Sequence, residues 1–184
     1  MKKIALLVIM LTGISCFSQT NYQLKVKVSE NMPAIEYIVD IHRSSQNTKI
    51  YFSTYTGIQK YSKTDKNRIE ELRLKKKRTA SDNKELMNLN NNSKVFTKEC
   101  YDYSANDSII KISDSIIQSK EDILSEIEKN KNRVVLDGIN LEVTVKNNSE
   151  YSYYIHAPDK KHYKLFAQFL VESLNDFKKV QNIN

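Results

Sequence analysis

The chain has 184 residues, a formal charge of +7, three glycines, two cysteines and no tryptophan. Beyond Gly13, the only glycines are Gly57 and Gly138. They are too few for a dinucleotide fingerprint, a P-loop or a Gly-x-Ser-x-Gly elbow. Cys16 and Cys100 cannot supply a four-thiolate zinc site. The composition therefore excludes several common enzyme classes, and we expect no cofactor.

The first 18 residues are typical of a secretory signal peptide. Two lysines precede an unbroken apolar run over 4–11, which is too short to span a bilayer. We expect cleavage after Ser18 and export of residues 19–184 to the periplasm or the exterior, with no transmembrane segment left. The alternatives are a retained N-terminal anchor and a lipoprotein acylated at Cys16.

Three segments after the signal alternate between apolar and polar residues. This period of two is typical of half-buried strands, and it runs over 22–28, 35–41 and 49–56. Consecutive segments are expected to form antiparallel hairpins with one apolar face. The expected pairs are Val28 with Ile35, Lys27 with Glu36, Ile50 with Ile41 and Phe52 with Val39.

A second alternating block surrounds Asp137-Gly138, the strongest short hairpin motif in the chain. The motif predicts a hairpin that pairs Leu136 with Ile139 and Arg133 with Glu142. A three-residue loop over 147–149 predicts one further hairpin. Its expected pairs are Val145 with Tyr151, Val143 with Tyr153, Leu141 with Ile155 and Lys146 with Glu150.

Two amphipathic helices are expected beside this block. Isoleucines at helical spacing predict one helix from an Asp107 cap to about Lys129. Aromatic and leucine residues predict another that follows an Asp159 cap and ends near Val180. The fold class is therefore expected to be α+β, with antiparallel meanders of about six strands and two main helices packed on one face of a single domain over 19–184.

The segment over 57–104 is the least regular part of the sequence. Residues 68–78 predict a short basic helix, 88–93 an asparagine-rich loop and 95–101 a strand. Cys100 lies in that strand and is expected to be a buried small apolar group. The alternative is a reactive thiol or a partner in an intermolecular disulfide.

The candidate catalytic residues are His156, Asp159 and His162. Two histidines and a carboxylate around one turn can bind a metal ion or exchange protons. Their spacing matches no established zinc motif, so we assign no metal site. The alternative interpretation makes Asp159 a helix cap and leaves both histidines as ordinary surface residues.

The candidate binding residues form a basic run. Residues 60–78 carry nine cations and three carboxylates. The run ends in Arg73, Lys75, Lys76, Lys77 and Arg78, without an interleaved aromatic residue to stack on a base. Export also argues against nucleic acid, and an envelope protein, an acidic glycan or an anionic surface is the expected partner. The alternative is a charged, solvated segment without a partner.

Tyrosines in the predicted strands offer a second binding surface. Tyr154, with Tyr51 and Tyr55, is expected on the outer face of the sheet as an exposed aromatic strip suited to a protein, glycan or peptide. The alternative is the ordinary composition of strands, which are rich in tyrosine.

Two segments resemble small exported proteins of Bacteroidota-type bacteria. One is the Lys-Lys start with its Phe17-Ser18 ending, and the other is the run 135–138 with the hairpin and helix that follow. The resemblance implies an exported compartment and supplies no catalytic residues. The sequence thus predicts an exported, non-enzymatic binding or accessory protein. The alternatives are a small hydrolase or metal-dependent enzyme and an inhibitor or immunity-type protein.

Overall fold

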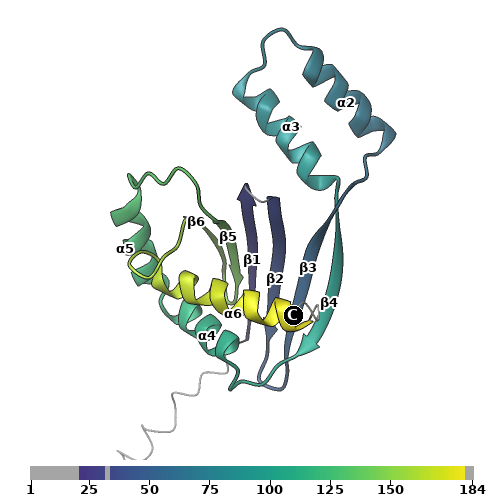
Figure 1. The fold of residues 1–184 in the computed structure, drawn as a ribbon. Helices are drawn as coiled ribbons and strands as arrows, with labels where there is room; N and C mark the ends of the chain where they lie inside the picture. The colour runs from purple at the N-terminus through teal and green to yellow at the C-terminus, as the bar shows by residue number, and fades with distance from the viewer. Residues whose placement is uncertain (1–20, 32–33, 181–184) are drawn as a thin grey trace, which may run out of the picture.

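The computed structural model describes residues 21–31 and 34–180 (Figure 1). The predicted signal and Cys16 lie outside these residues and stay predictions. Six antiparallel strands form one sheet in the order β4-β3-β2-β1-β5-β6, which confirms the α+β class. The strands are β1 (Tyr22–Asn31), β2 (Ala34–Arg43), β3 (Thr48–Gln59), β4 (Lys94–Asp102), β5 (Asn140–Lys146) and β6 (Glu150–His156).

Helices occupy two separate places in the molecule. Three of them cover one face of the sheet, and two form a helical hairpin that projects beyond the sheet from the ends of β3 and β4 (Figure 1). The covering helices are α4 (Ser108–Gln118), α5 (Lys120–Asn130) and α6 (Lys164–Val180), and the hairpin consists of α2 (Lys63–Leu74) and α3 (Ala80–Asn92).

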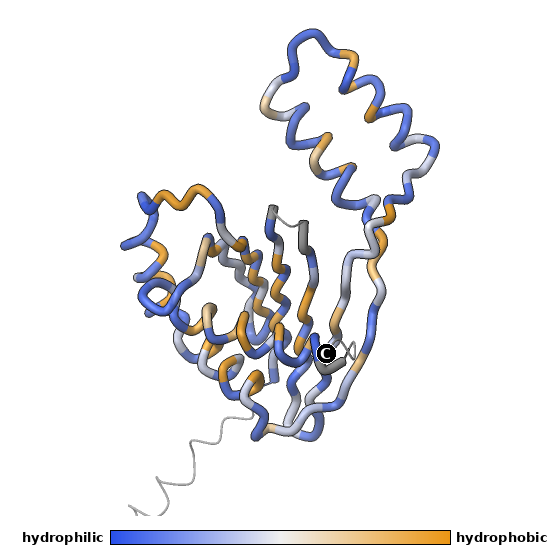
Figure 2. Tube along the Cα trace, in the orientation of Figure 1, coloured by the Kyte–Doolittle hydropathy of each residue, from blue (hydrophilic) through white to orange (hydrophobic). Residues whose placement is uncertain are grey.

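The core lies between the sheet and the covering helices. Every second side chain of the central strands points into it, including Val26, Val39 and Leu141, each fully buried. Phe166 and Phe169 of α6 close the core from the other side. Figure 2 shows the resulting alternation of apolar and polar residues along the central strands. Burying each such side chain contributes about 1.5–3 kcal/mol.

The first hairpin has a different register from the predicted one. Val28 lies opposite Tyr37, two residues beyond Ile35. A shift of two residues keeps every side chain on its face, so apolar alternation cannot distinguish the two registers. The observed register lengthens the ladder until Asn31 pairs with Ala34. Lys27 still contacts the Glu36 carboxylate, now diagonally, at 3.4 Å.

Two of the other three predicted registers are confirmed. In the β2–β3 pair, Ile41 lies opposite Ile50, and Val39 lies opposite Phe52. The β5–β6 pair has its loop at 147–149. All four predicted pairs form, including Val143 with Tyr153 and Lys146 with Glu150.

The predicted Asp137-Gly138 hairpin was wrong. Residues 131–139 form a loop because both edges of β5 are occupied, one by β1 and the other by β6. Only glycine fits at position 138, because the chain passes close to Ala157 there. A Cβ on residue 138 would lie 2.6 Å from the Cβ of Ala157. Arg133 accordingly does not lie opposite Glu142. Val134 and Leu136 are 84% and 94% exposed.

Both predicted covering helices needed correction. The helix expected over 107–129 is interrupted at Ser119, which separates α4 from α5. The Asp107 carboxylate makes no cap to the helix and accepts the backbone N–H of Ser104 at 2.6 Å. The last helix begins at Lys164, so Asp159 is not its cap. Tyr163, directly before this helix, has a φ of 57°.

The middle segment is more regular than predicted. The asparagine-rich run belongs to α3 and not to the predicted loop. The predicted basic helix is present as α2, but it begins and ends earlier than expected and leaves 75–78 outside it. The predicted strand is confirmed by β4. Ile69 and Leu72 are buried but lie outside the main core cluster. The helical hairpin therefore has a small core of its own.

Cys100 is exposed, which contradicts the prediction that it is buried. It lies on β4, at the edge of the sheet, opposite Tyr51. The next residue, Tyr101, packs against the core. Because successive side chains of a strand point to opposite faces, Cys100 lies on the face that the helices leave open.

We expect Phe169→Ala to lower the free energy of unfolding by about 3–5 kcal/mol, because a fully buried aromatic ring is lost and leaves a cavity. Val171→Ala is the matched control on the same helix, since Val171 is 57% exposed. Urea unfolding followed by circular dichroism measures both. Equal effects of the two substitutions would contradict the assigned core.

We also expect the sheet to fold without the helical hairpin. Gln59 and Lys94 are a register pair, and the N–H of Lys60 donates to the carbonyl of Ser93 at 2.7 Å, so the base of the hairpin is already narrow. Replacing residues 60–93 with Asn-Gly supplies a two-residue turn at this point. Thermal unfolding of the shortened chain should remain cooperative. Loss of the cooperative transition would show that the hairpin is part of the same folding unit.

Candidate functional site

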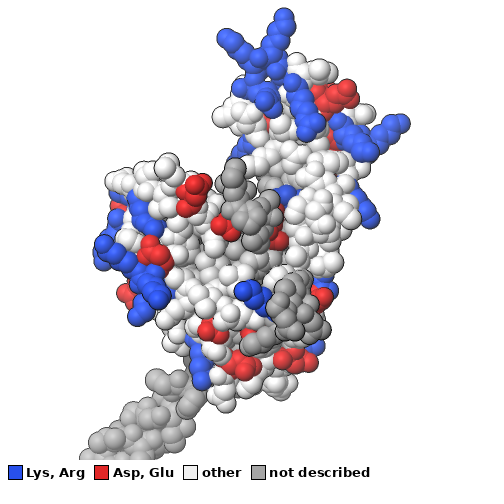
Figure 3. All heavy atoms as spheres, in the orientation of Figure 1, with Lys and Arg blue, Asp and Glu red and all other residues white. Residues whose placement is uncertain are grey.

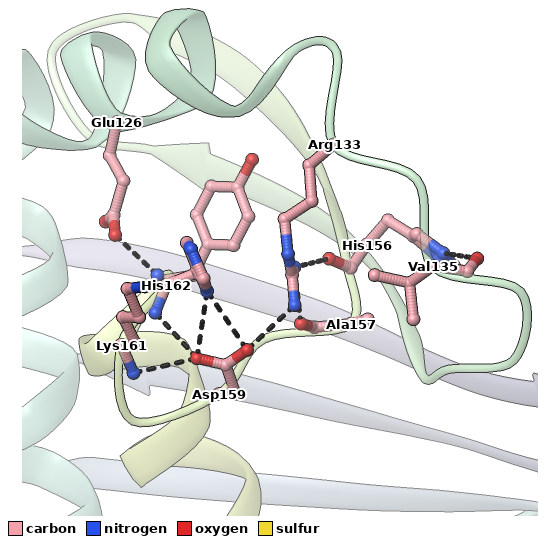
Figure 4. A network of polar contacts seen from close by, with 9 residues as sticks. Glu126, Arg133, Val135, His156, Ala157, Asp159, Lys161 and His162 are labelled. Carbon is pink, nitrogen blue, oxygen red and sulfur yellow. Dashed lines mark hydrogen bonds and ion pairs between the residues drawn. The ribbon is translucent and has the colours of Figure 1, made fainter.

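Two of the three candidate catalytic residues meet in the loop before α6 (Figure 4). The Asp159 carboxylate lies 3.1 Å from Nδ1 of His162. It also accepts the backbone N–H groups of Lys161 and His162, each at 2.7 Å. These contacts, first of all the His162 backbone hydrogen bond, lower the pKa of Asp159 to about 2. The carboxylate therefore stays ionised at neutral pH.

His156 does not join this pair. Its Nδ1 lies 2.7 Å from Oδ1 of Asn140, and its Nε2 lies 3.0 Å from the carbonyl oxygen of Val135. The ring thus bridges β5 and the 131–139 loop. Figure 4 shows its contact with Val135. Its position opposite Asn140 follows from the β5–β6 register.

Arg133 is the member of this cluster that the sequence did not indicate. Its guanidinium donates to the Asp159 carboxylate at 2.7 Å and to the carbonyl oxygens of Ala157 and His156 at 2.8 and 3.2 Å. One side chain thereby ties the 131–139 loop to the connection between β6 and α6. Asp159 is separated from it by 26 residues, a distance at which no local motif operates.

The contacts of this cluster stabilise the turn that leads from β6 to α6. They hold Ala157 and Tyr163 at φ values of 48° and 57°, which non-glycine residues seldom adopt. Glu126 of α5 accepts the backbone N–H of Tyr163. Over the described part of the chain, no group of three or more His, Cys, Asp or Glu is arranged to hold a metal ion. The Asp159 carboxylate that contacts His162 is also paired with Arg133.

Two hollows lie beside this polar cluster. One, of about 690 Å³, lies between α4 and α6 and has a mainly apolar lining that includes Ile112, Ile139 and Leu174. The other, of about 420 Å³, is polar and adjoins Glu126 and His162. Neither brings His156 together with Asp159 and His162.

The basic candidates lie at the far end of the helical hairpin. Lys75, Lys76, Lys77 and Arg78 connect α2 to α3, and we call this segment the tip. All four side chains are exposed. Figure 3 shows lysine and arginine side chains gathered at this end of the molecule. Arg73 lies in the last turn of α2, also exposed.

Three of the five carboxylates of the hairpin form ion pairs, and none of these pairs involves the cations at 76–78. Arg68 forms a bidentate pair with Glu85, at 2.7 and 2.8 Å, and a further contact with Glu71 at 3.0 Å. Lys75 contacts Asp82 at 2.7 Å. That contact and the hydrogen bonds from Thr79 lower the pKa of Asp82 to about 2.

The other three tip residues, Lys76, Lys77 and Arg78, form no ion pair with any residue that the structure describes. Residues 60–93 hold ten cations and five carboxylates, whereas the rest of 19–184 holds seventeen of each. The helical hairpin thus carries the whole excess charge of residues 19–184. Five other hairpin cations, Lys60, Lys63, Lys66, Arg73 and Lys84, also form no ion pair with a described residue. The three unpaired cations of the tip differ from these in following one another at the end of the hairpin.

The predicted aromatic strip is divided. Tyr154 is 61% exposed on β6 and donates its hydroxyl to Oδ1 of Asn140 at 2.8 Å. Tyr51 and Tyr55 lie on β3, from which β6 is separated by three strands. Ammonium groups of β4 already cover both rings, that of Lys98 at 4.2 Å from the centre of the Tyr51 ring. Tyr154 is therefore an isolated exposed ring.

We expect Asp159→Asn to destabilise the protein at neutral pH and to have a much smaller effect near pH 2. A carboxyl whose pKa is lower in the folded chain contributes stability above its ordinary pKa of 3.8 and loses that contribution as the pH falls through about 2. Urea unfolding of both proteins between pH 2 and pH 6 measures the difference. Asp137→Asn, in the exposed loop, is the control. A difference that does not change with pH would contradict the assigned contacts.

Comparisons with protein-family models, with curated proteins and with solved structures gave no match for this chain. Among the described residues, no helix has both the length and the apolar character needed to cross a membrane. Any function must therefore be inferred from the geometry and the charge of this chain alone.

Proposed function

We propose that this chain is an exported, non-enzymatic binding protein that engages an anionic partner through the tip of its helical hairpin. The observation that carries the proposal is the set of three exposed, unpaired cations at positions 76–78. They follow one another at the end of a projecting element, where a partner meets them before it meets the body.

The charge distribution supports binding by the tip in preference to the body. Between exposed charges, attraction falls away over a Debye length, about 8 Å at physiological salt. The body has equal numbers of cations and carboxylates over 19–59 and 94–184 together. It has no net charge with which to attract a polyanion, so the tip sets both the orientation and the salt dependence of binding.

The enzyme alternative has less geometric support. It needs His156, Asp159 and His162 at one reacting centre. The His156 ring instead makes hydrogen bonds with Asn140 and with the carbonyl oxygen of Val135. The arrangement of Asp159, His162 and Arg133 is accounted for by the turn that they stabilise.

We expect the triple variant Lys76→Gln, Lys77→Gln, Arg78→Gln to bind an anionic polymer about tenfold to hundredfold more weakly at low salt. Each cation near an anionic surface contributes about 1 kcal/mol, and 1.4 kcal/mol is a factor of ten in affinity. The dependence of binding on salt should become flatter. Retention on immobilised heparin between low and physiological salt measures both quantities.

Lys75 is left unchanged in this variant because it pairs with Asp82, whose carboxylate also accepts the Thr79 N–H at the start of α3. The matched control is Lys25→Gln, Lys111→Gln, Lys178→Gln, which removes the same charge from exposed positions on the body. If both triple variants lose equal affinity, net charge and not the tip governs binding, and the proposal fails.

A further inference from the structure

One exposed apolar side chain lies directly before the tip. Leu74 is the last residue of α2, lies between Arg73 and Lys75, and is 76% exposed. The other large apolar residues of α2, Ile69 and Leu72, are buried. Leu74 therefore takes no part in the small core of the hairpin and is presented at the same end as the cations.

We propose, as an extension of the proposed function, that the anionic partner is the surface of a bilayer containing anionic phospholipid, and that Leu74 enters its interface. Such a surface offers negative headgroups and, directly beneath them, an apolar layer. The cations at 76–78 can contact the negative headgroups, and Leu74 can enter the apolar layer. A soluble polyanion such as an acidic glycan offers no apolar layer, so it would leave Leu74 in water.

The shape of the hairpin allows this approach. α2 has 12 residues, which at 1.5 Å per residue gives a length of about 18 Å. This exceeds the Debye length of about 8 Å at physiological salt. The hairpin projects away from the sheet (Figure 1), so the carboxylates of the body are screened from a surface that the tip touches.

Ion pairing within the hairpin reduces the repulsion between its carboxylates and an anionic surface. Arg68 contacts both Glu71 and Glu85, and Lys75 contacts Asp82, so two cations offset two of these three negative charges. One leucine and three unpaired cations give reversible, salt-sensitive attachment, since firm anchoring requires more apolar area than a single side chain buries.

The absence of tryptophan from the sequence allows a direct test. In Leu74→Trp, the introduced indole is the only one in the chain and reports its own surroundings. Vesicles of phosphatidylcholine mixed with phosphatidylglycerol should shift its emission to shorter wavelength, and brominated acyl chains should quench it. Vesicles of phosphatidylcholine alone should do neither.

The matched control is Leu136→Trp, which places the indole at an apolar site on the body that is 94% exposed. Its emission should not change with either vesicle. Leu74→Ser, tested by flotation with the mixed vesicles, should reduce binding severalfold while leaving retention on heparin unchanged, because heparin has no apolar layer to contact.

Two results would overturn the inference. If the protein binds heparin but not the mixed vesicles, the partner is a soluble polyanion, and the proposed function stands without a membrane. If it binds the vesicles while the Leu74→Trp emission stays constant and Leu74→Ser has no effect, attachment is purely electrostatic and no residue enters the interface. Binding to neither probe would remove the proposed function as well.

Discussion

The pairing of β1 with β5 is the constraint on which the rest of the structure depends. It joins β1 to a strand more than one hundred residues later in the chain, through seven register pairs from Gln23–Lys146 to Ser29–Asn140. Through β1 it connects β2, β3 and β4 to the β5–β6 hairpin in one sheet. Val26 and Val143 thereby lie side by side on a continuous apolar face that α4 and α6 can cover. Because β1 and β6 take both edges of β5, residues 131–139 are kept out of the sheet.

That exclusion explains the polar cluster before α6. A loop outside the sheet has backbone groups without ladder partners and must be held by other contacts. Arg133 and His156 supply them, one at the start of the loop and the other near its middle. The cluster resembles a catalytic arrangement in composition, but each of its contacts serves to fix the chain where it turns from β6 into α6. The backbone groups and positive φ values at this turn therefore account for its histidines and carboxylate.

The sequence was informative where neighbours in space are neighbours in the chain. Alternation located the strands, and a loop of fixed length set the β5–β6 register; for the first hairpin, a slip of two residues preserved both faces and left the register undetermined. The β1–β5 pair and the Arg133–Asp159 contact join distant segments, for which no local pattern exists. The helix α3 was missed because its surface is rich in asparagine, although Thr79 and Asp82 form a capping box that does mark its start.

The helical hairpin shows how stability and surface charge are coupled in a small element. Two buried apolar residues of α2 give it little core, so the pairing of Arg68 with Glu85 joins α2 to α3 by a second means. An exposed pair of this kind contributes modestly, and its bidentate geometry places it at the stronger end of that range. The same pair removes a carboxylate from the field of the tip. The contacts that hold the two helices together are therefore also those that leave the charge of Lys76, Lys77 and Arg78 uncompensated within the hairpin.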